Sequence, residues 1–159
     1  MIKVGIVGYG NLGRGVLLAL QNASDMELVG VFTRRSPKAL ETAVPCDVYS
    51  VKDLLKFKGK IDLLILCGGS ATDLPETTKE LLKDFNTIDT FDTHAKIPDY
   101  YAVLDEVGKK NDTLSLISVG WDPGMFSLAR LYFGSVLPDG NVYTFWGKGV
   151  SQGHSDAVR

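Results

Sequence analysis

Three stretches of this 159-residue chain combine carboxylates, hydroxyls and a histidine directly after apolar runs. They are CGGSATD at 67–73, DTFDTH at 89–94 and SVGWDPGMFS at 118–127. If the apolar runs are parallel strands, these stretches meet at the carboxyl edge of one sheet, where such sheets bind ligands. The small residues at 67–72 would let a flat cofactor lie against the backbone. Carboxylates beside it can hold a cationic group and accept its proton, which indicates chemistry on an amine.

Each of these polar side chains also has a purely structural explanation. Asp73 and Asp122 stand where a helix is expected to begin, and Asp is a common N-cap residue. Asp92 and His94 could be solvated loop residues. The functional interpretation depends on their coincidence at one edge of one sheet.

A glycine pattern near the start of the chain indicates a binding site for a dinucleotide. Gly8, Gly10 and Gly13 form G-x-G-x-x-G after a strand-like run and before a helix-like one, the context that gives this common pattern meaning. The first glycine permits a tight turn, the second lets a pyrophosphate approach, and the third lets helix and strand pack closely. The helix N-terminus adds amide donors for phosphate. The alternative is a plain turn from strand to helix.

The residues after the next apolar run indicate which dinucleotide is bound. In this motif an acidic residue about 20 positions on usually holds the ribose 2′-hydroxyl of NAD. Here Thr33, Arg34 and Arg35 occupy that place, without an acid. Guanidinium groups attract a phosphate and bind it with paired hydrogen bonds, and the threonine adds a hydroxyl donor. We therefore expect NADP; the alternative is that the arginines are only exposed surface residues.

Short β-branched runs alternate with longer helical patterns, and these elements must position the polar groups. The alternation predicts an α/β fold of the Rossmann type, a doubly wound parallel sheet with right-handed crossovers. We expect an NADP-binding domain at 1–138 and, at 139–159, the truncated start of a second, α+β substrate domain, which about 20 residues are too few to complete. Trp121 and Trp146 flank this junction. The expected strands are 2–8, 26–33, 61–69, 86–91 and 113–120, and the expected helices are 11–21, 51–57, 73–85, 98–110 and 124–137.

Composition argues against several classes of function. A formal net charge of -2 argues against a nucleic-acid or anionic-membrane partner, which would attract a surplus of basic residues. No apolar run approaches the roughly 20 residues of a membrane span. Cys46 and Cys67 lack the spacing of a metal site or a disulfide framework, so we expect a cytoplasmic protein without a bound metal.

Six longer motifs carry a more specific signal: GYGNLGRGV, FTRR, CGGSATDLPE, DTFDTHAKIP, GWDPGMFS and FWGKGVSQGHSDA. In this order and spacing they resemble the meso-diaminopimelate dehydrogenase family, over the whole chain. The resemblance implies a homodimeric, NADPH-dependent enzyme that interconverts meso-diaminopimelate with L-2-amino-6-oxopimelate and ammonium, on the route to lysine and peptidoglycan. Family members continue well past residue 159, and that later part supplies most of the substrate domain.

The resemblance also implies roles for individual residues. Asp92 and Asp122 are the catalytic residues near the reacting amino group, and which of them is the base is left open. The pyrophosphate loop is Gly8, Tyr9, Gly10, Asn11, Leu12 and Gly13, and the 2′-phosphate clamp is Thr33, Arg34 and Arg35. The other cofactor-binding residues are Cys67, Gly68, Gly69, Ser70, Ala71, Thr72, Asp92, Thr93, His94, Trp121, Pro123 and Gly124. The substrate-binding residues are Asp92, Trp121, Asp122, Met125, Phe126, Trp146, Gln152 and Gly153, while His154 and Asp156 share the last motif without an assigned role.

The implied reaction is oxidative deamination of the D-centre, through an imine that water converts to ketone and ammonium. Two alternatives stay open. One is another NADP-dependent reductase, similar to dihydrodipicolinate reductase, against which the last motifs argue. The other is a non-catalytic NADP-binding module, which would bind cofactor without diaminopimelate-dependent reduction.

Overall fold

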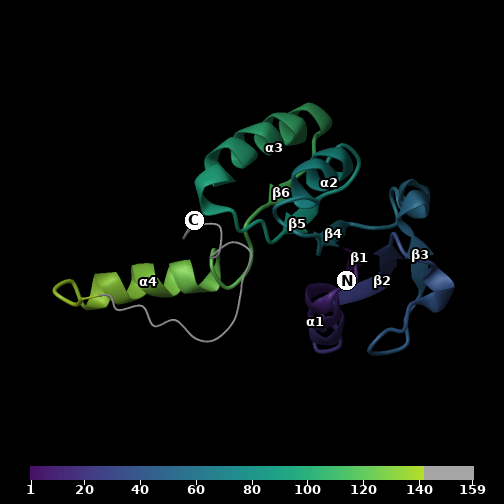
Figure 1. Ribbon diagram of the computed structural model, residues 1–159, viewed down its shortest axis with the longest axis horizontal. Helices are drawn as coiled ribbons and strands as arrows, with labels where there is room; N and C mark the ends of the chain where they lie inside the picture. Colours follow the sequence, from purple (N-terminus) through teal and green to yellow (C-terminus); the bar gives the residue numbers. More distant parts are fainter. Residues whose placement is uncertain (142–159) are drawn as a thin grey trace.

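Six parallel strands form one sheet, in the order β3-β2-β1-β4-β5-β6 (Figure 1). The computed structural model describes residues 1–141, so Trp146, Gln152, Gly153, His154 and Asp156 lie outside the described residues. The chain runs outward from β1 to β3, then returns to β4 on the other side of β1 and runs outward again. The strands are β1 Ile2–Val7, β2 Met26–Thr33, β3 Val48–Ser50, β4 Leu63–Leu66, β5 Thr87–Asp89 and β6 Ser115–Leu116. This confirms the doubly wound Rossmann-type sheet and places its switch point between β1 and β4.

Helices cover both faces of the sheet, because neighbouring strand residues point to opposite sides. Ile6 and Val31 are fully buried against Leu17 of α1, whereas Val7 and Phe32 belong to a larger core on the other face. That larger core also contains buried residues of α2, α3 and the 3-10 helix η2. The helices are α1 Asn11–Leu20, α2 Leu74–Leu81, α3 Ile97–Asn111 and α4 Met125–Val136, with short 3-10 helices η1 Pro37–Ala39, η2 Val51–Phe57 and η3 His94–Lys96.

Several elements differ in extent from the expectation. The strands expected at 61–69 and 113–120 are shorter, and β3 and η1 were not predicted. After β4 the chain leaves the sheet at Cys67, where small residues form a turn instead of extending the strand. β6 is an edge strand of two residues that pairs with β5, and its Leu116 is 58% exposed. β3 pairs through three residues with the end of β2.

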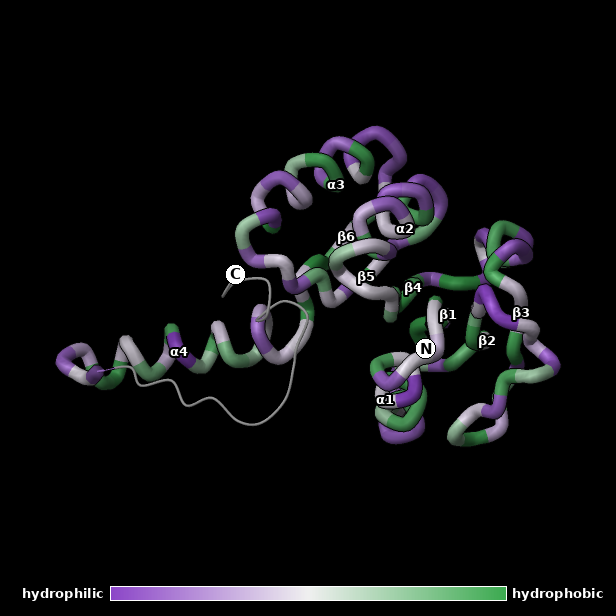
Figure 2. The backbone as a smooth tube through the Cα atoms, viewed as in Figure 1, coloured by the Kyte–Doolittle hydropathy of each residue, from purple (hydrophilic) through white to green (hydrophobic). Residues whose placement is uncertain are grey.

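The last described helix, α4, projects away from the sheet and its covering helices (Figure 1). None of its residues is buried. Figure 2 shows hydrophobic segments along much of its length, and large apolar side chains there are exposed, among them Leu131 at 71%. The domain boundary at 138/139 stays a prediction. No helix in the described part of the chain is both long and apolar enough to span a bilayer.

Candidate functional site

The turn between β1 and α1 has the geometry of a phosphate-binding loop. Gly8 adopts φ +93°, a left-handed conformation that favours glycine. A Cβ on Gly13 would lie 2.3 Å from the carbonyl oxygen of Gly8, so only glycine lets α1 begin this close to the strand. A Cβ on Gly10 would meet nothing within 4 Å, so the loop is open on that side. The N-terminus of α1 has no side-chain cap and no acidic residue in its first turn, which suits an anion.

The two arginines of the expected 2′-phosphate clamp point to different partners. Arg34 donates from Nη1 and Nη2 to the two carboxylate oxygens of Asp73, at 3.0 and 3.1 Å. The Arg34 hydrogen bond is the main reason that the pKa of Asp73 lies below its ordinary value. Asp73 stands at the N-cap position of α2 but makes no cap hydrogen bond, so the capping explanation fails for its side chain. The ion pair borders a cavity of about 240 Å³ that Val7, Gly8, Phe32 and Leu74 help to line.

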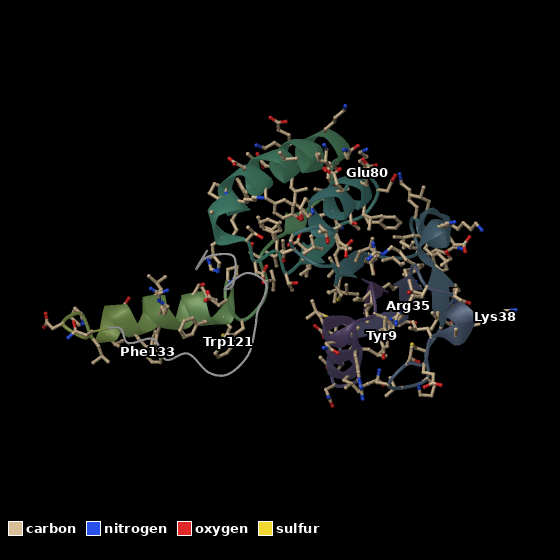
Figure 3. The ribbon with its side chains drawn as sticks, viewed as in Figure 1. Tyr9, Arg35, Lys38, Glu80, Trp121 and Phe133 are labelled. Atoms are coloured by element: carbon tan, nitrogen blue, oxygen red, sulfur yellow. The ribbon has the colours of Figure 1, made fainter. Side chains whose placement is uncertain are left out.

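Arg35 lies on the other side of the glycine loop. Its Nη2 donates to the carbonyl oxygen of Tyr9, and Figure 3 shows the two residues together. The Tyr9 hydroxyl in turn accepts from the amide of Ala43 at 2.7 Å, which ties the loop to the segment before β3. A polar cavity of about 560 Å³ lies between the glycine loop and the segment before β3, and Arg35 and Arg14 of α1 line it. Arg14 was missed from the sequence; the signal was an arginine directly after the third glycine of the motif.

Thr33 is buried, with 3% of its surface exposed, and its hydroxyl oxygen accepts from the amide of Arg35 at 3.1 Å. It shapes the turn that presents the arginines. Direct donation to a phosphate from this position stays a prediction.

The turn after β4 lies at the switch point, as expected for a cofactor wall. The amide of Cys67 donates to the carbonyl of Val7 at 2.8 Å, which ties this turn to β1. Burial raises the pKa of the Cys67 thiol to about 12, so the thiol is protonated and unreactive at neutral pH. Ser70 is almost buried; its hydroxyl donates to the carbonyl of Thr90 at 3.4 Å and accepts from the amide of Asp92 at 3.1 Å. Gly68, Gly69, Ala71 and Thr72 complete the turn that precedes α2.

Asp92 lies in the segment after β5, with Thr93 and His94 at the start of η3. Its Oδ1 atom is buried and has no hydrogen-bond partner in the described part of the chain. A buried carboxylate oxygen without a donor is costly, so we expect a donor from outside the described residues to reach it in the complete site.

A neighbouring carboxylate, Asp89, is fully buried at the end of β5. Its Oδ1 accepts from the amides of Phe91 and Ser118, at 3.0 and 3.2 Å. Its Oδ2 accepts from the hydroxyls of Thr78 and Tyr100, at 3.1 and 2.5 Å. Burial, followed by the hydrogen bond to Asp89, raises the pKa of Tyr100 far above its ordinary value. We assigned Asp89 no role from the sequence, because its importance depends on the segments that meet around it in the fold.

Asp122 lies in the tight loop between β6 and α4. The N-cap residue of α4 is Gly124, so Asp122 is not the helix cap. The loop is closed by its own backbone: the amide of Gly120 donates to Pro123 at 3.1 Å, and the amide of Met125 donates to Gly120 at 3.0 Å. Trp121, labelled in Figure 3, is 70% exposed and Met125 is 62% exposed. The Trp121 ring stacks on Phe126 with centroids 5.9 Å apart.

The structure therefore brings the three polar stretches to one edge of the sheet. Hydrogen bonds join the turn after β4 to the Asp92 segment through Ser70, and β5 to the segment after β6 through Asp89. The glycine loop adjoins this edge at the switch point. In the described residues, no three His, Cys, Asp or Glu side chains gather as a metal site requires.

Two family models match separate parts of the chain. Residues 2–88 match an oxidoreductase family with an NAD-binding Rossmann fold, and residues 120–159 match the diaminopimelic acid dehydrogenase C-terminal domain.

Individual relatives agree with both models. A meso-diaminopimelate D-dehydrogenase from Lysinibacillus sphaericus is 60% identical over 99% of this chain and 48% of its own length. A variant of the Clostridium tetani E88 enzyme, solved with diaminopimelate, is 50% identical with a TM-score of 0.84, over 100% of this chain and 49% of that one. An engineered D-amino acid dehydrogenase bound to NADP+ is 44% identical with a TM-score of 0.84, over 99% and 48% of the two chains.

The chain thus spans about half the length of the relatives it matches. It belongs to the oxidoreductase family with an NAD-binding Rossmann fold, and over nearly its whole length it is similar to meso-diaminopimelate D-dehydrogenases.

Proposed function

We propose that the protein containing this chain catalyses NADP-dependent oxidative deamination of the D-centre of meso-2,6-diaminopimelate, yielding L-2-amino-6-oxopimelate and ammonium. The observation that carries the proposal is the meeting of the Asp92 segment, held through Ser70, and the loop toward Asp122, held through Asp89, at the sheet edge that adjoins the glycine loop. An ammonium group supplies N–H donors and the charge opposite to these carboxylates. The similarity to relatives that act on this substrate supports the choice of amine.

The residues present fit a bound NADP. The open face of Gly10 and the uncapped N-terminus of α1 receive the pyrophosphate, and Arg35 supplies a guanidinium for the 2′-phosphate. The arginine turn without an acid supports NADP over NAD. Bound NADP+ supplies a hydride acceptor.

The chain itself positions the amine and takes its proton. Asp92 orients the ammonium, and Asp122 supplies a second carboxylate from the next loop along the sheet. One of the two carboxylates removes the proton and later assists the attack of water on the imine. Trp121, Met125 and Phe126 contribute the apolar wall of the substrate pocket, together with the part of the protein that follows. We also propose a cytoplasmic homodimer, which the uncovered apolar surface of α4 and the isolated cysteines support.

The test uses the complete gene product with meso-diaminopimelate and NADP+, recording NADPH formation and ammonium release together. We expect both for the wild type, and slower turnover for Asp92→Asn and for Asp122→Asn, by roughly 10²–10⁴-fold for whichever of the two carboxylates is the general base. Asp105→Asn, which breaks an ion pair with Lys109 on the surface of α3, is the matched control and should keep its rate. NADP binding without diaminopimelate-dependent reduction would instead identify a cofactor-binding module.

A further inference from the structure

Asp89 connects both loops of the proposed site to a single carboxylate. Phe91, which donates to Oδ1, immediately precedes Asp92, and Ser118, the second donor to Oδ1, begins the loop that leads to Asp122. The carbonyl of Asp89 also accepts from the amide of Val119, at 2.9 Å. Two segments that are far apart in sequence are thereby held at one point.

The two oxygens of Asp89 divide their partners by kind. In the described residues, Oδ1 accepts backbone amides from the two loops, whereas Oδ2 accepts hydroxyls from Thr78 of α2 and Tyr100 of α3. No ion pair in the described residues includes Asp89, so hydrogen bonds alone satisfy this buried carboxyl group there. Oδ1 therefore binds the two loops of the proposed site, and Oδ2 binds α2 and α3.

The backbone conformation of Ser118 also indicates that Oδ1 of Asp89 holds the loop after β6. Ser118 has φ +59°, a left-handed conformation that a non-glycine residue adopts only when its surroundings hold it there. The hydrogen bond from the Ser118 amide to Oδ1 of Asp89 helps to hold this conformation. The Ser118 hydroxyl is buried without a partner in the described part of the chain. The loop toward Asp122 thus leaves β6 in a direction that Asp89 imposes.

We infer that Asp89 is a positioning residue for the reaction: its Oδ1 fixes the two loops that carry Asp92 and Asp122, so that both carboxylates face one amine. This rests on the proposed function, because it assigns the purpose of holding those loops together. Asp89 does not touch the substrate; it acts through the backbone amides of Phe91 and Ser118.

The test compares Asp89→Ala, Asp89→Asn and the double variant Thr78→Val/Tyr100→Phe in the complete gene product. Ala removes the acceptor for both loops, whereas Asn keeps one oxygen for the two amides and offers its NH2 group to the hydroxyls. The double variant spares Oδ1 and removes only the helix hydroxyls. We expect Asp89→Ala to lower kcat by about 10²-fold, the scale of a small misplacement of catalytic groups, with NADPH affinity little changed. Asp89→Asn should recover most of that loss, and the double variant should lose stability but keep kcat.

Amide hydrogen exchange in segments 90–93 and 117–120 gives a readout that needs no activity. Exchange in both segments should rise in Asp89→Ala and stay near the wild-type rate in the double variant. Asp89→Ser is made in parallel, so that a folded variant can be assayed if Ala does not fold. Equal loop exchange in the double variant and in the folded Asp89 variant, or wild-type kcat in that Asp89 variant, overturns the inference. A wild-type protein that does not oxidise diaminopimelate contradicts the proposed function instead, and the exchange data still decide the role of Asp89.

Discussion

The two adjacent arginines after β2 differ in their surroundings more than their sequence suggests. Arg34 is paired with Asp73 beside one cavity, and Arg35 reaches Tyr9 beside another that Arg14 also lines. A phosphate at the second cavity meets an Arg35 that has no ion pair in the described residues, although Glu41 also lines this cavity, whereas Arg34 would first have to leave Asp73. The two residues should consequently contribute unequally to the choice between NADPH and NADH.

We predict that Arg35→Ala removes most of the preference for NADPH, because a charge-assisted hydrogen bond of roughly 1.5–3 kcal/mol is lost only for the cofactor with the 2′-phosphate. Arg14→Ala should act in the same direction, and Arg34→Ala should change the preference less. Titration of both cofactors into each variant measures this, with the exposed Lys38→Ala as control. A preference that survives Arg35→Ala but disappears in Arg34→Ala would contradict the assignment.

The Arg34–Asp73 pair also predicts a pH dependence of stability. Because Arg34 lowers the pKa of folded Asp73, the pair stabilises the protein above the ordinary aspartate pKa of about 3.9, and this contribution is lost as the pH falls through the lower folded value. A solvent-exposed pair contributes up to about 1 kcal/mol. The free energy of unfolding of Arg34→Ala should therefore lie below that of the wild type at neutral pH and converge with it in acid. Urea denaturation across this range checks the sign; a gap that widens in acid would refute it.

At the scale of elements, the sequence predicted best the strands that are buried on both faces. The central strands β1, β2 and β4 read as apolar runs because helices cover both their faces; the extents of β1 and β2 were close to the prediction, whereas β4 is shorter than the expected 61–69. β3 and β6 were missed or overextended, because a two- or three-residue strand owes its existence to the neighbour it pairs with rather than to its own pattern.

The same distinction applies to the candidate site. Strand-end carboxylates such as Asp92 and Asp122 could be found from the sequence, because their placement follows from the sheet alone. Arg14 and Asp89 could not be assigned in this way, since their importance depends on which segments meet around them in the folded chain.

The start of α1 offers a direct test of the glycine loop. Gly13→Ala should destabilise the protein by roughly 1–3 kcal/mol, the cost of overpacking, and weaken NADPH binding, because the new Cβ would collide with the carbonyl of Gly8. Gly15→Ala, two residues later in the same helix, meets nothing within 4 Å and should stabilise by about 0.5–1 kcal/mol. Thermal melts and NADPH titrations of Gly13→Ala and Gly15→Ala measure both effects. Equal melting temperatures for the two variants would mean that α1 can move away from the loop.

At the scale of the whole molecule, α4 is a helix whose apolar side chains contact little of the described chain. Leu128, Leu131 and Tyr132 are 65%, 71% and 65% exposed, and they lie at the spacing of one helix face. An apolar face of this kind is covered in a working protein by a partner or by further chain.

We therefore predict that the 159-residue polypeptide self-associates through α4. Leu128→Lys combined with Leu131→Lys should shift it toward monomer, because each lysine places a charge where apolar contact forms. Leu55→Lys, at a similarly exposed leucine on η2, serves as the control and should leave association unchanged. Light scattering across a concentration series measures the effect. A monodisperse monomer before any substitution would contradict the prediction.

The strand order has a consequence for the way the protein is made. β1 is synthesised before the other strands of this sheet, yet it lies at the centre of the sheet, where Val4 pairs with Leu28 on one side and with Leu63 on the other. The Gly8 turn packs against the backbone of Cys67, which directly follows β4. The nascent chain thus carries its complete glycine loop before the backbone that this loop packs against exists, and we expect the loop to take its shape only once β4 and Cys67 have been synthesised.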